Sequence, residues 1–243
     1  MNLDILKPPV EKLSDTLFEE KEVNVFMCRL DKVHPILSGN KIYKLHYFLQ
    51  EVLESENALE KYNRTILTFG GIYSNHLAAT AYACKMLDIK CIGVVRGQRH
   101  PKSTHTLKQC EADGMHLHFV NKLKYQFRDT MGFQDEMTDM FGKCLIIPEG
   151  GYHPMGTKGA SLIMEAFNFK KYSHICTATG TATTLAGILT AVPSTIEIIS
   201  VPVLKNMTDI PTVKITFLFS RSAGSYIPCP MIILKCSVTD YER

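Results

Sequence analysis

The feature that most constrains the fold is a regular alternation of short β-rich runs with longer helical runs. The β-rich runs lie at 23–28, 65–70, 91–95, 115–120, 144–148, 173–179 and 196–203. Helical periodicity predicts helices at 41–57, 74–87, 104–113, 124–142, 157–169 and from about 184. In the first of these, Leu45, Phe48, Leu49 and Val52 share one apolar face. Strands that alternate with helices form right-handed βαβ units, so the sequence predicts an α/β fold whose parallel sheets are covered on both faces.

The last stretch of the chain breaks this alternation. Residues 211–243 contain two apolar β-like runs and three prolines, and they show no helical periodicity. We therefore expect an atypical C-terminal tail that does not continue a doubly wound sheet.

Composition narrows the classes of partner. The 243 residues, 45% of them apolar, suffice for one large or two modest domains. A net charge of +3 without a basic, aromatic-interleaved stripe argues against a nucleic-acid partner. No run approaches the ~20 apolar residues that span a bilayer, and early acids make the N-terminus unlike a signal peptide. The eight scattered cysteines form no C-x-x-C pair, which favours reduced, buried thiols and a cytoplasmic location.

Three loops stand where chemistry collects in α/β proteins, between a strand or turn and a helix N-terminus. The first is "SGNK", 38–41, where Lys41 is either a solvated helix-start residue or a reactive amine. The second is "FGGIYSNH", 69–76, where Ser74 and Asn75 could simply cap the next helix. The third is "ATGTATTLAG", 178–187, whose small and hydroxylated residues fit either a phosphate cradle or a tight turn.

Other kinds of site fit less well. The third loop is neither a G-x-x-x-x-G-K-[ST] loop nor a G-x-G-x-x-G fingerprint, which disfavours a nucleotide-binding module. His116 and His118 share a strand face, but no third ligand lies nearby in sequence, so no metal site is predicted. A phosphate cradle without a nucleotide fingerprint suits a small phosphorylated cofactor, and an amine at a loop–helix junction suits a Schiff base.

Taken together, the loops resemble motifs of the fold-type-II pyridoxal-phosphate enzymes, specifically the 1-aminocyclopropane-1-carboxylate deaminase and D-cysteine desulfhydrase family. The family's Gly-Gly-Asn-Lys-x-Arg-Lys-Leu motif is matched by "SGNKIYKL", and its Gly-x-Ile-Gln-Ser-Asn-His/Gln motif by "GGIYSNH". Its Pro-x-Gly-Gly-x-x-Pro-x-Gly loop is matched by "PEGGYHPMG", and its phosphate loop by "TGTATTLAG". The resemblance covers roughly residues 20–205, with the motifs in the family's order.

The resemblance implies a tryptophan-synthase-β-like pair of parallel-sheet α/β domains. Residues 1–50 with 157–243 would form the large cofactor-binding domain and 51–156 the small one, with pyridoxal 5'-phosphate between them. It also implies a homodimer that converts a small amino acid to a 2-oxo acid and ammonia. Neither a nucleic acid nor a membrane is implied as a partner.

The resemblance also assigns roles to single residues. Lys41 would form the internal aldimine with the cofactor aldehyde and move protons, and Ser74 would meet the substrate carboxylate as a second catalytic residue. Asn75 would face the cofactor's ring oxygen. Lys44 is either a second active-site cation or a solvated lysine. The phosphate cradle would be Gly180, Thr181, Ala182, Thr183 and Thr184.

The chain departs from the family's motifs at several positions. Ser38 replaces a glycine, Tyr43 an arginine and Tyr73 a glutamine. The tail lacks the family's Tyr-x-Gly-Lys pattern with its ring-stacking tyrosine, and its only tyrosines are Tyr226 and Tyr241. These departures leave two readings, an active deaminase or desulfhydrase and a catalytically inactive relative that still binds the cofactor.

Overall fold

The structure is a computed structural model that describes residues 7–37, 39–100, 103–203, 215–217 and 231–236. The chain divides into two compact units. The larger unit comprises Met1–Tyr43 and Lys158–Arg243, and the smaller unit comprises Lys44–Thr157. Among the described residues, no helix is both long and apolar enough to cross a membrane.

The smaller unit contains a four-stranded sheet in the order β5-β4-β3-β6, and all of its pairings are parallel. Its strands are β3 (Thr65–Gly70), β4 (Lys90–Arg96), β5 (Met115–Val120) and β6 (Leu145–Ile147). β3 is buried along its whole length, as expected of a central strand in a parallel sheet covered on both faces. The predicted βαβ organisation is confirmed in this unit.

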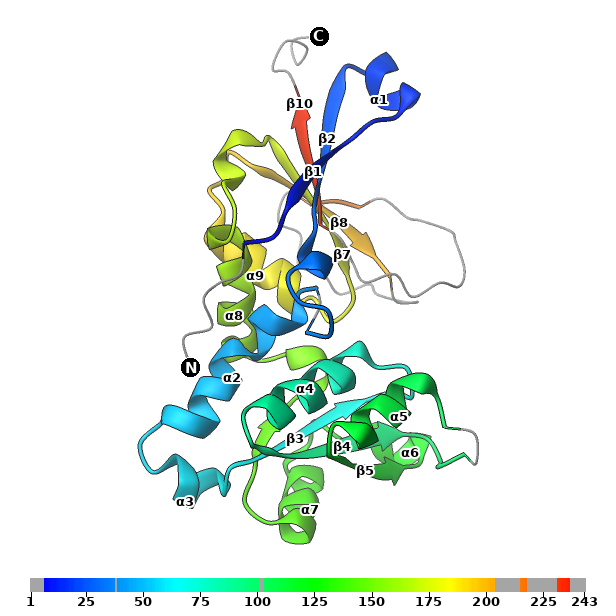
Figure 1. Ribbon diagram of the computed structural model, residues 1–243, viewed down its shortest axis with the longest axis vertical. Helices are drawn as coiled ribbons and strands as arrows, with labels where there is room; N and C mark the ends of the chain where they lie inside the picture. Colours follow the sequence, from blue (N-terminus) through cyan, green and yellow to red (C-terminus); the bar gives the residue numbers. More distant parts are fainter. Residues whose placement is uncertain (1–6, 38, 101–102, 204–214, 218–230, 237–243) are drawn as a thin grey trace. The chain divides into compact units, whose positions relative to one another are not determined.

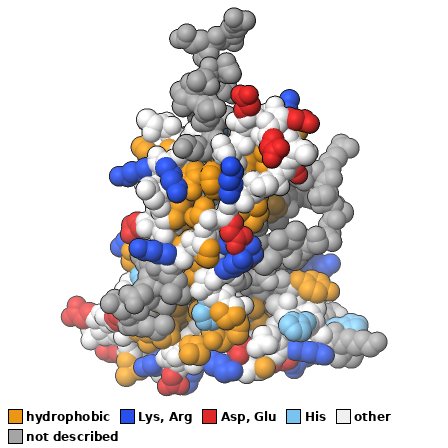
Figure 2. All heavy atoms as spheres, turned by 45° about the horizontal axis from the view of Figure 1, so that its top comes forward, with side chains coloured by type: hydrophobic (Ala, Val, Ile, Leu, Met, Phe, Trp, Pro, Cys, Tyr) orange, Lys and Arg blue, Asp and Glu red, His pale blue; other side chains and the backbone are white. Residues whose placement is uncertain are grey.

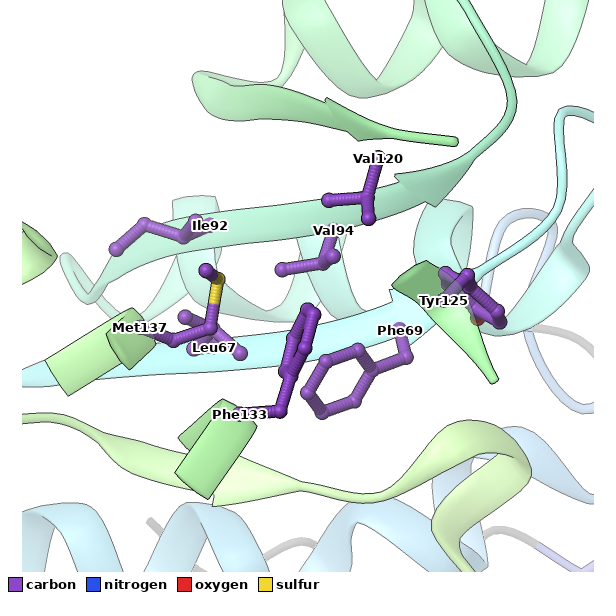
Figure 3. Close-up of a cluster of buried hydrophobic side chains, with 8 residues drawn as sticks. All are labelled: Leu67, Phe69, Ile92, Val94, Val120, Tyr125, Phe133 and Met137. Carbon is purple, nitrogen blue, oxygen red and sulfur yellow. The ribbon is translucent and has the colours of Figure 1, made fainter. Parts of the chain in front are cut away.

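Helices pack on the faces of this parallel sheet. α4 (Asn75–Met86) packs against β3 and β4, and α5 (His105–Ala112) packs against β5 (Figure 1). Side chains of β3, β4 and β5 and of the segment 125–137 form a buried apolar cluster (Figure 3). Its members are Leu67, Phe69, Ile92, Val94, Val120, Tyr125, Phe133 and Met137.

The predicted helix at 124–142 is wrong in one respect, because the structure has two helices there. These are α6 (Lys122–Tyr125) and α7 (Met131–Phe141). Asn121 Oδ1 accepts a hydrogen bond from the Lys124 N–H (2.9 Å), and Thr130 Oγ1 accepts one from the Phe133 N–H (3.4 Å). Each polar side chain caps a helix start, so the chain ends one helix and begins another.

α2 (Lys41–Glu54) forms where the periodicity predicts it, and α3 (Ala58–Tyr62) follows it. The predicted apolar face of α2 is buried, with Leu45, Phe48, Leu49 and Val52 each at most 5% exposed. α8 (Pro154–Glu165) begins three residues before the predicted start at 157. Proline suits the first helical turn, and His153 Nδ1 accepts a hydrogen bond from the Met155 N–H at 3.2 Å.

The larger unit contains a six-stranded sheet in the order β1-β2-β10-β7-β8-β9. β7, β8 and β9 are parallel, whereas the β1–β2, β2–β10 and β10–β7 pairings are antiparallel. The strands are β1 (Val10–Leu13), β2 (Val23–Cys28), β7 (His174–Thr179), β8 (Glu197–Pro202), β9 (Ile215–Phe217) and β10 (Met231–Cys236). The α/β class is confirmed, but half of this sheet departs from the expected parallel arrangement.

The antiparallel pairing of β1 with β2 has a physical cause in their connection. Only the short α1 (Thr16–Glu20) links β1 to β2, and a parallel pairing needs a crossover of a dozen or more residues. β9 and β10 belong to the tail. β9 continues the parallel pairing beside β8, so the expectation that the tail does not continue a doubly wound sheet is wrong for β9, whereas β10 is antiparallel to both of its neighbours. α9 (Thr183–Ala191) packs against β7.

On the face of the molecule in Figure 2, cationic and anionic side chains are interspersed.

Candidate functional site

Lys41 begins α2 directly after a tight turn in the larger unit. Gly39 has φ +70°, a left-handed conformation that glycine adopts readily, and its N–H donates to the Leu30 carbonyl at 2.9 Å. The turn therefore delivers Lys41 to the first helical position, where its side chain is half-buried. The Lys41 amine donates to Asn40 Oδ1 at 2.6 Å. This contact makes Lys41 an oriented amine rather than a fully solvated one.

The predicted phosphate loop ends at the N-terminus of α9. Ala182 is the N-cap residue and has φ +59°, which is unusual for a residue with a side chain. Thr183 and Thr184 begin the helix, and the Thr181 and Thr183 hydroxyls lie 3.1 Å apart. The first N–H groups of a helix have no partner within the helix, so this turn presents N–H and hydroxyl donors together. Such donors suit an anion.

The strand that leads into this loop is fixed at its end. Thr179, the last residue of β7, places its hydroxyl 2.7 Å from that of Ser200 on β8, and both side chains are buried. The Val203 N–H also donates to the Thr179 carbonyl at 3.0 Å. The loop therefore begins from a rigid carboxyl end of the parallel strands, where ligands bind in α/β sheets.

Asn40 connects the lysine to the phosphate loop. Its side-chain Nδ2–H donates to Thr184 Oγ1 at 2.6 Å, while its Oδ1 accepts from the Lys41 amine. Two of the three loops that the sequence singled out therefore meet through one asparagine within the larger unit. Asn40 was not among the predicted site residues, and the signal that could have identified it is its position beside Lys41 in the "SGNK" motif.

Ser74 and Asn75 lie at the start of α4 in the smaller unit. Ser74 is the N-cap residue, and its Oγ accepts a hydrogen bond from the Leu77 N–H at 3.2 Å. The capping reading is therefore correct for Ser74, and its catalytic role stays a prediction. Asn75 is the first residue of α4 and is exposed, so its amide can reach a ligand.

His76 follows the Ser74–Asn75 loop and takes part in a buried chain of hydrogen bonds. The Thr68 hydroxyl donates to the Ile147 carbonyl at 2.9 Å and lies 2.9 Å from His76 Nε2. Because the hydroxyl has one proton, Nε2–H is the donor in the contact with Thr68. This buried chain ties β3, α4 and β6 together beneath Ser74 and Asn75. His76 ends the "GGIYSNH" motif, and no role was predicted for it.

Lys44 is buried, at 4% exposure, so the solvated reading of this lysine is wrong. It packs beside the glycine loop of the "PEGG" motif, because a Cβ on Gly151 would lie 3.5 Å from Lys44 Cε. Gly151 also has φ +73°. Arg128 Nε pairs with Glu149 Oε2 at 3.0 Å and fixes the same loop from another side.

The two tyrosines that replace polar family residues have different environments. Tyr43 is a core residue at 4% exposure, and burial, followed by the nearby Cys28, raises the pKa of its phenol. Tyr73 is 59% exposed on the loop before Ser74. Tyr73 is therefore the replacement that can contact a ligand.

Other candidate chemistry is not assembled into a site. In the part of the chain that the structure describes, no group of three or more His, Cys, Asp or Glu side chains could hold a metal ion. His116 and His118 instead pack against Phe141, with ring centroids 5.7 and 5.3 Å apart. Tyr226 and Tyr241, the tyrosines of the tail, lie outside the described residues.

The larger unit offers a donor set that fits one kind of cofactor. Pyridoxal 5'-phosphate carries its aldehyde and its phosphate ester on adjacent ring positions, so a lysine that holds the aldehyde must stand close to the phosphate cradle. Lys41 and Thr184 meet this requirement, since each is hydrogen-bonded to Asn40. An oriented lysine beside a threonine-lined helix N-terminus therefore suits pyridoxal phosphate.

Comparison with known proteins points to the same cofactor. The sequence profile of the family described as "Pyridoxal-phosphate dependent enzyme" matches residues 3–206, and the chain belongs to this family. Pyridoxal phosphate is therefore its cofactor. A Thermotoga maritima protein named "Putative 1-aminocyclopropane-1-carboxylate deaminase" is 31% identical over 195 residues, which cover 77% of this chain and 60% of that protein.

Two further relatives agree. The Arabidopsis thaliana "Bifunctional D-cysteine desulfhydrase/1-aminocyclopropane-1-carboxylate deaminase, mitochondrial" is 30% identical over 169 residues, 63% of this chain and 41% of that protein. The crystal structure of an "ACC deaminase homologue" superposes with a TM-score of 0.65 at 24% identity, covering 81% of this chain and 60% of that one, and shows the fold alone. The chain spans about half the length of the curated relatives it matches.

Proposed function

We propose that this chain carries the cofactor-binding part of a deaminase or desulfhydrase that acts on a small amino acid. The substrate would be 1-aminocyclopropane-1-carboxylate or D-cysteine. The products would be a 2-oxo acid and ammonia, with water consumed and with hydrogen sulfide released from D-cysteine. The observation that carries the proposal is the Lys41–Asn40–Thr184 contact, which joins the lysine amine to the predicted phosphate cradle through one side chain.

The proposal gives Lys41 two tasks. It would hold the cofactor at its aldehyde, and its amine would carry a proton to and from the substrate. The cofactor supplies an electron sink for the bonds at the substrate's α-carbon. The half-buried position of Lys41 and its contact with Asn40 support these tasks, since they limit the orientations of the amine.

The phosphate would be held at the N-terminus of α9. N–H groups and hydroxyls of this turn can donate to a phosphate dianion, and the helix dipole favours negative charge there. The left-handed φ of Ala182 supports the assignment, because strained residues cluster at ligand sites. The donors would come from Gly180, Thr181, Ala182, Thr183 and Thr184.

Ser74 and Asn75 would serve the same reaction. The Ser74 Oγ accepts from the Leu77 N–H, which leaves its own proton able to donate to a substrate carboxylate. The exposed Asn75 amide would donate to the ring oxygen of the cofactor. Both assignments rest on the match of "GGIYSNH" to the family motif.

Cytoplasmic location and a homodimer complete the proposal. Buried, free thiols at Cys28, Cys84, Cys91 and Cys110 support a reducing compartment. The homodimer comes from the family resemblance, and gel filtration of the purified protein tests it.

Cofactor titration followed by turnover assays tests the proposed function. The purified protein should bind pyridoxal phosphate with a new visible absorbance band that Lys41→Ala lacks, and it should release a 2-oxo acid from at least one of the two substrates. A band without product from either substrate would support the alternative, a catalytically inactive relative. Absence of both the band and the product would refute the proposal.

A further inference from the structure

Asn40 is placed between two groups that belong to opposite ends of the proposed cofactor site. Its side chain accepts from the Lys41 amine and donates to the Thr184 hydroxyl, and both hydrogen bonds are 2.6 Å long. The N–H···O bonds of proteins cluster near 2.9–3.0 Å, so both contacts are short. Residues 40 and 184 are 144 positions apart in sequence, so the contact is made by the fold of the larger unit.

The two ends of an asparagine side chain are not interchangeable. The Oδ1 end can only accept, which suits the Lys41 amine, and the Nδ2 end can only donate. The Thr184 oxygen therefore accepts from Asn40, and the proton of the Thr184 hydroxyl has to point elsewhere. Thr184 stands in the first turn of α9, where the helix N-terminus attracts an anion. A hydroxyl that already accepts one hydrogen bond is also a better donor in the next.

The turn that contains Asn40 is fixed by a backbone hydrogen bond. Gly39 is buried and left-handed, and its N–H is bonded to the Leu30 carbonyl at 2.9 Å. At the other end of the contact, Thr184 is 9% exposed. The short contacts therefore join two well-packed segments, β2–α2 and β7–α9, within the larger unit.

We propose that Asn40 is a positioning residue that fixes the direction of a hydrogen-bond relay from the Lys41 amine to the phosphate-binding turn of α9. It orients the amine through Oδ1, and through Nδ2 it turns the Thr184 hydroxyl toward the phosphate. The proposal deepens the proposed function and rests on it for the identity of the ligand. The hydrogen-bond direction itself concerns only residues of this chain.

The first test is a double-mutant cycle on cofactor affinity, measured by spectroscopic titration of the cofactor-free protein with pyridoxal phosphate. Asn40→Ala and Thr184→Val should each weaken binding about 10-fold, the scale of one hydrogen bond. Because both remove the same relay, the double variant should also be about 10-fold weaker. Independent roles would multiply to about 100-fold, and that result, or unchanged affinity in either single variant, would overturn the proposal.

Two matched variants separate the relay from general damage to the fold. Thr184→Ser keeps the hydroxyl and should keep affinity within about 2-fold of the parent. Thr190 lies on the same helix and donates to the Gly187 carbonyl at 2.9 Å, so Thr190→Val should leave cofactor affinity unchanged. A loss in Thr190→Val equal to that in Thr184→Val would mean that the effect is structural.

The second test needs no cofactor and no activity. Acylation of Lys41 in the cofactor-free protein is followed by peptide mass spectrometry across a range of pH. In Asn40→Asp the carboxylate replaces a neutral acceptor beside the amine, so the pH of half-maximal Lys41 reactivity should rise by about 1 unit. The same variant cannot donate to Thr184 and should weaken cofactor binding more than Asn40→Ala does.

The outcomes of this test separate failure of the proposed function from failure of the Asn40 relay. If the parent fails to bind pyridoxal phosphate but Lys41 reactivity shifts in Asn40→Asp, the proposed function fails and the contact between Asn40 and the amine stands. If the parent binds the cofactor and Lys41 reactivity has the same pH profile in the parent, Asn40→Ala and Asn40→Asp, the relay is refuted and the proposed function stands.

Discussion

Gly70→Ala is the substitution whose cost can be worked out most directly from contacts at the candidate site. Gly70 ends β3, and a Cβ there would lie 2.6 Å from Ser74 Oγ and 2.7 Å from Leu77 Cγ. Its backbone is not left-handed, so the cost comes from contacts alone. Both neighbours belong to the first turn of α4, which is itself packed against β3 and β4.

The magnitude follows from two losses and one gain. Overpacking of a close-packed site costs about 1–3 kcal/mol, and displacement of the Ser74 cap from the Leu77 N–H costs about 1 kcal/mol. Replacing glycine returns about 0.5–1 kcal/mol through the unfolded chain. Gly70→Ala should therefore lower the free energy of unfolding by about 2 kcal/mol.

The same substitution at two other glycines provides controls. At Gly93 the new Cβ would lie 2.5 Å from Sδ of the buried Met115, so alanine there should also cost about 1–3 kcal/mol but should leave the Ser74 cap intact. At Gly132, within α7, nothing lies within 4 Å, so alanine should stabilise the protein by about 0.5 kcal/mol.

Urea unfolding followed by far-ultraviolet circular dichroism measures the series, since the chain has no tryptophan. Hydrogen exchange at the Leu77 amide localises the effect, because only Gly70→Ala disturbs the cap that protects it. A Gly70→Ala protein as stable as the parent, with Leu77 still protected, would refute the packing argument for this loop.

Three further predictions concern the cofactor, pH and thiols. Ala182→Glu adds bulk and a like charge at the phosphate turn and should weaken pyridoxal-phosphate binding by at least ~1–3 kcal/mol in titration, whereas Ala182→Gly, which suits φ +59°, should not. Hydrogen bonds from Tyr62 and then Lys61 lower the pKa of Glu51, so the stability they give is present above the unfolded-state pKa and is lost as pH falls through the folded-state pKa. Tyr62→Phe should therefore cost about 1.5 kcal/mol at neutral pH in urea unfolding and little in acid. Burial raises the pKa of the Cys110 thiol to about 12, so a thiol reagent at pH 8 should label this residue only after unfolding.

Much of the fold could be predicted because its strongest signals are local. β2, β3 and β5 have the predicted bounds, since each is a compact β-rich run between polar or glycine residues. The apolar face of α2 follows from the helical repeat alone. The break at 126–130 and the antiparallel insertion of β10 could not be predicted in this way. The break depends on two capping side chains, and the pairing of β10 with β2 joins residues about two hundred positions apart.

The candidate site, like the fold, could be predicted only where its signals are local in sequence. The motifs identified Lys41 and the loop at 180–184 as separate features, because each has its own composition. The asparagine that joins them could not be selected, since the contact of Asn40 with Thr184 spans 144 positions and depends on the fold. Lys44 also has no sequence signal that distinguishes a buried lysine from a solvated one. Its burial follows from the fold, which packs it beside Gly151.

The central claim is that Lys41 is the amine that holds pyridoxal phosphate beside the N-terminus of α9. Borohydride reduction of the cofactor-loaded protein, followed by proteolysis and peptide mass spectrometry, tests it directly. We expect one phosphopyridoxyl group per chain, located on Lys41. A label on Lys44 or on another lysine, or a cofactor-loaded protein that reduction does not label, would contradict it.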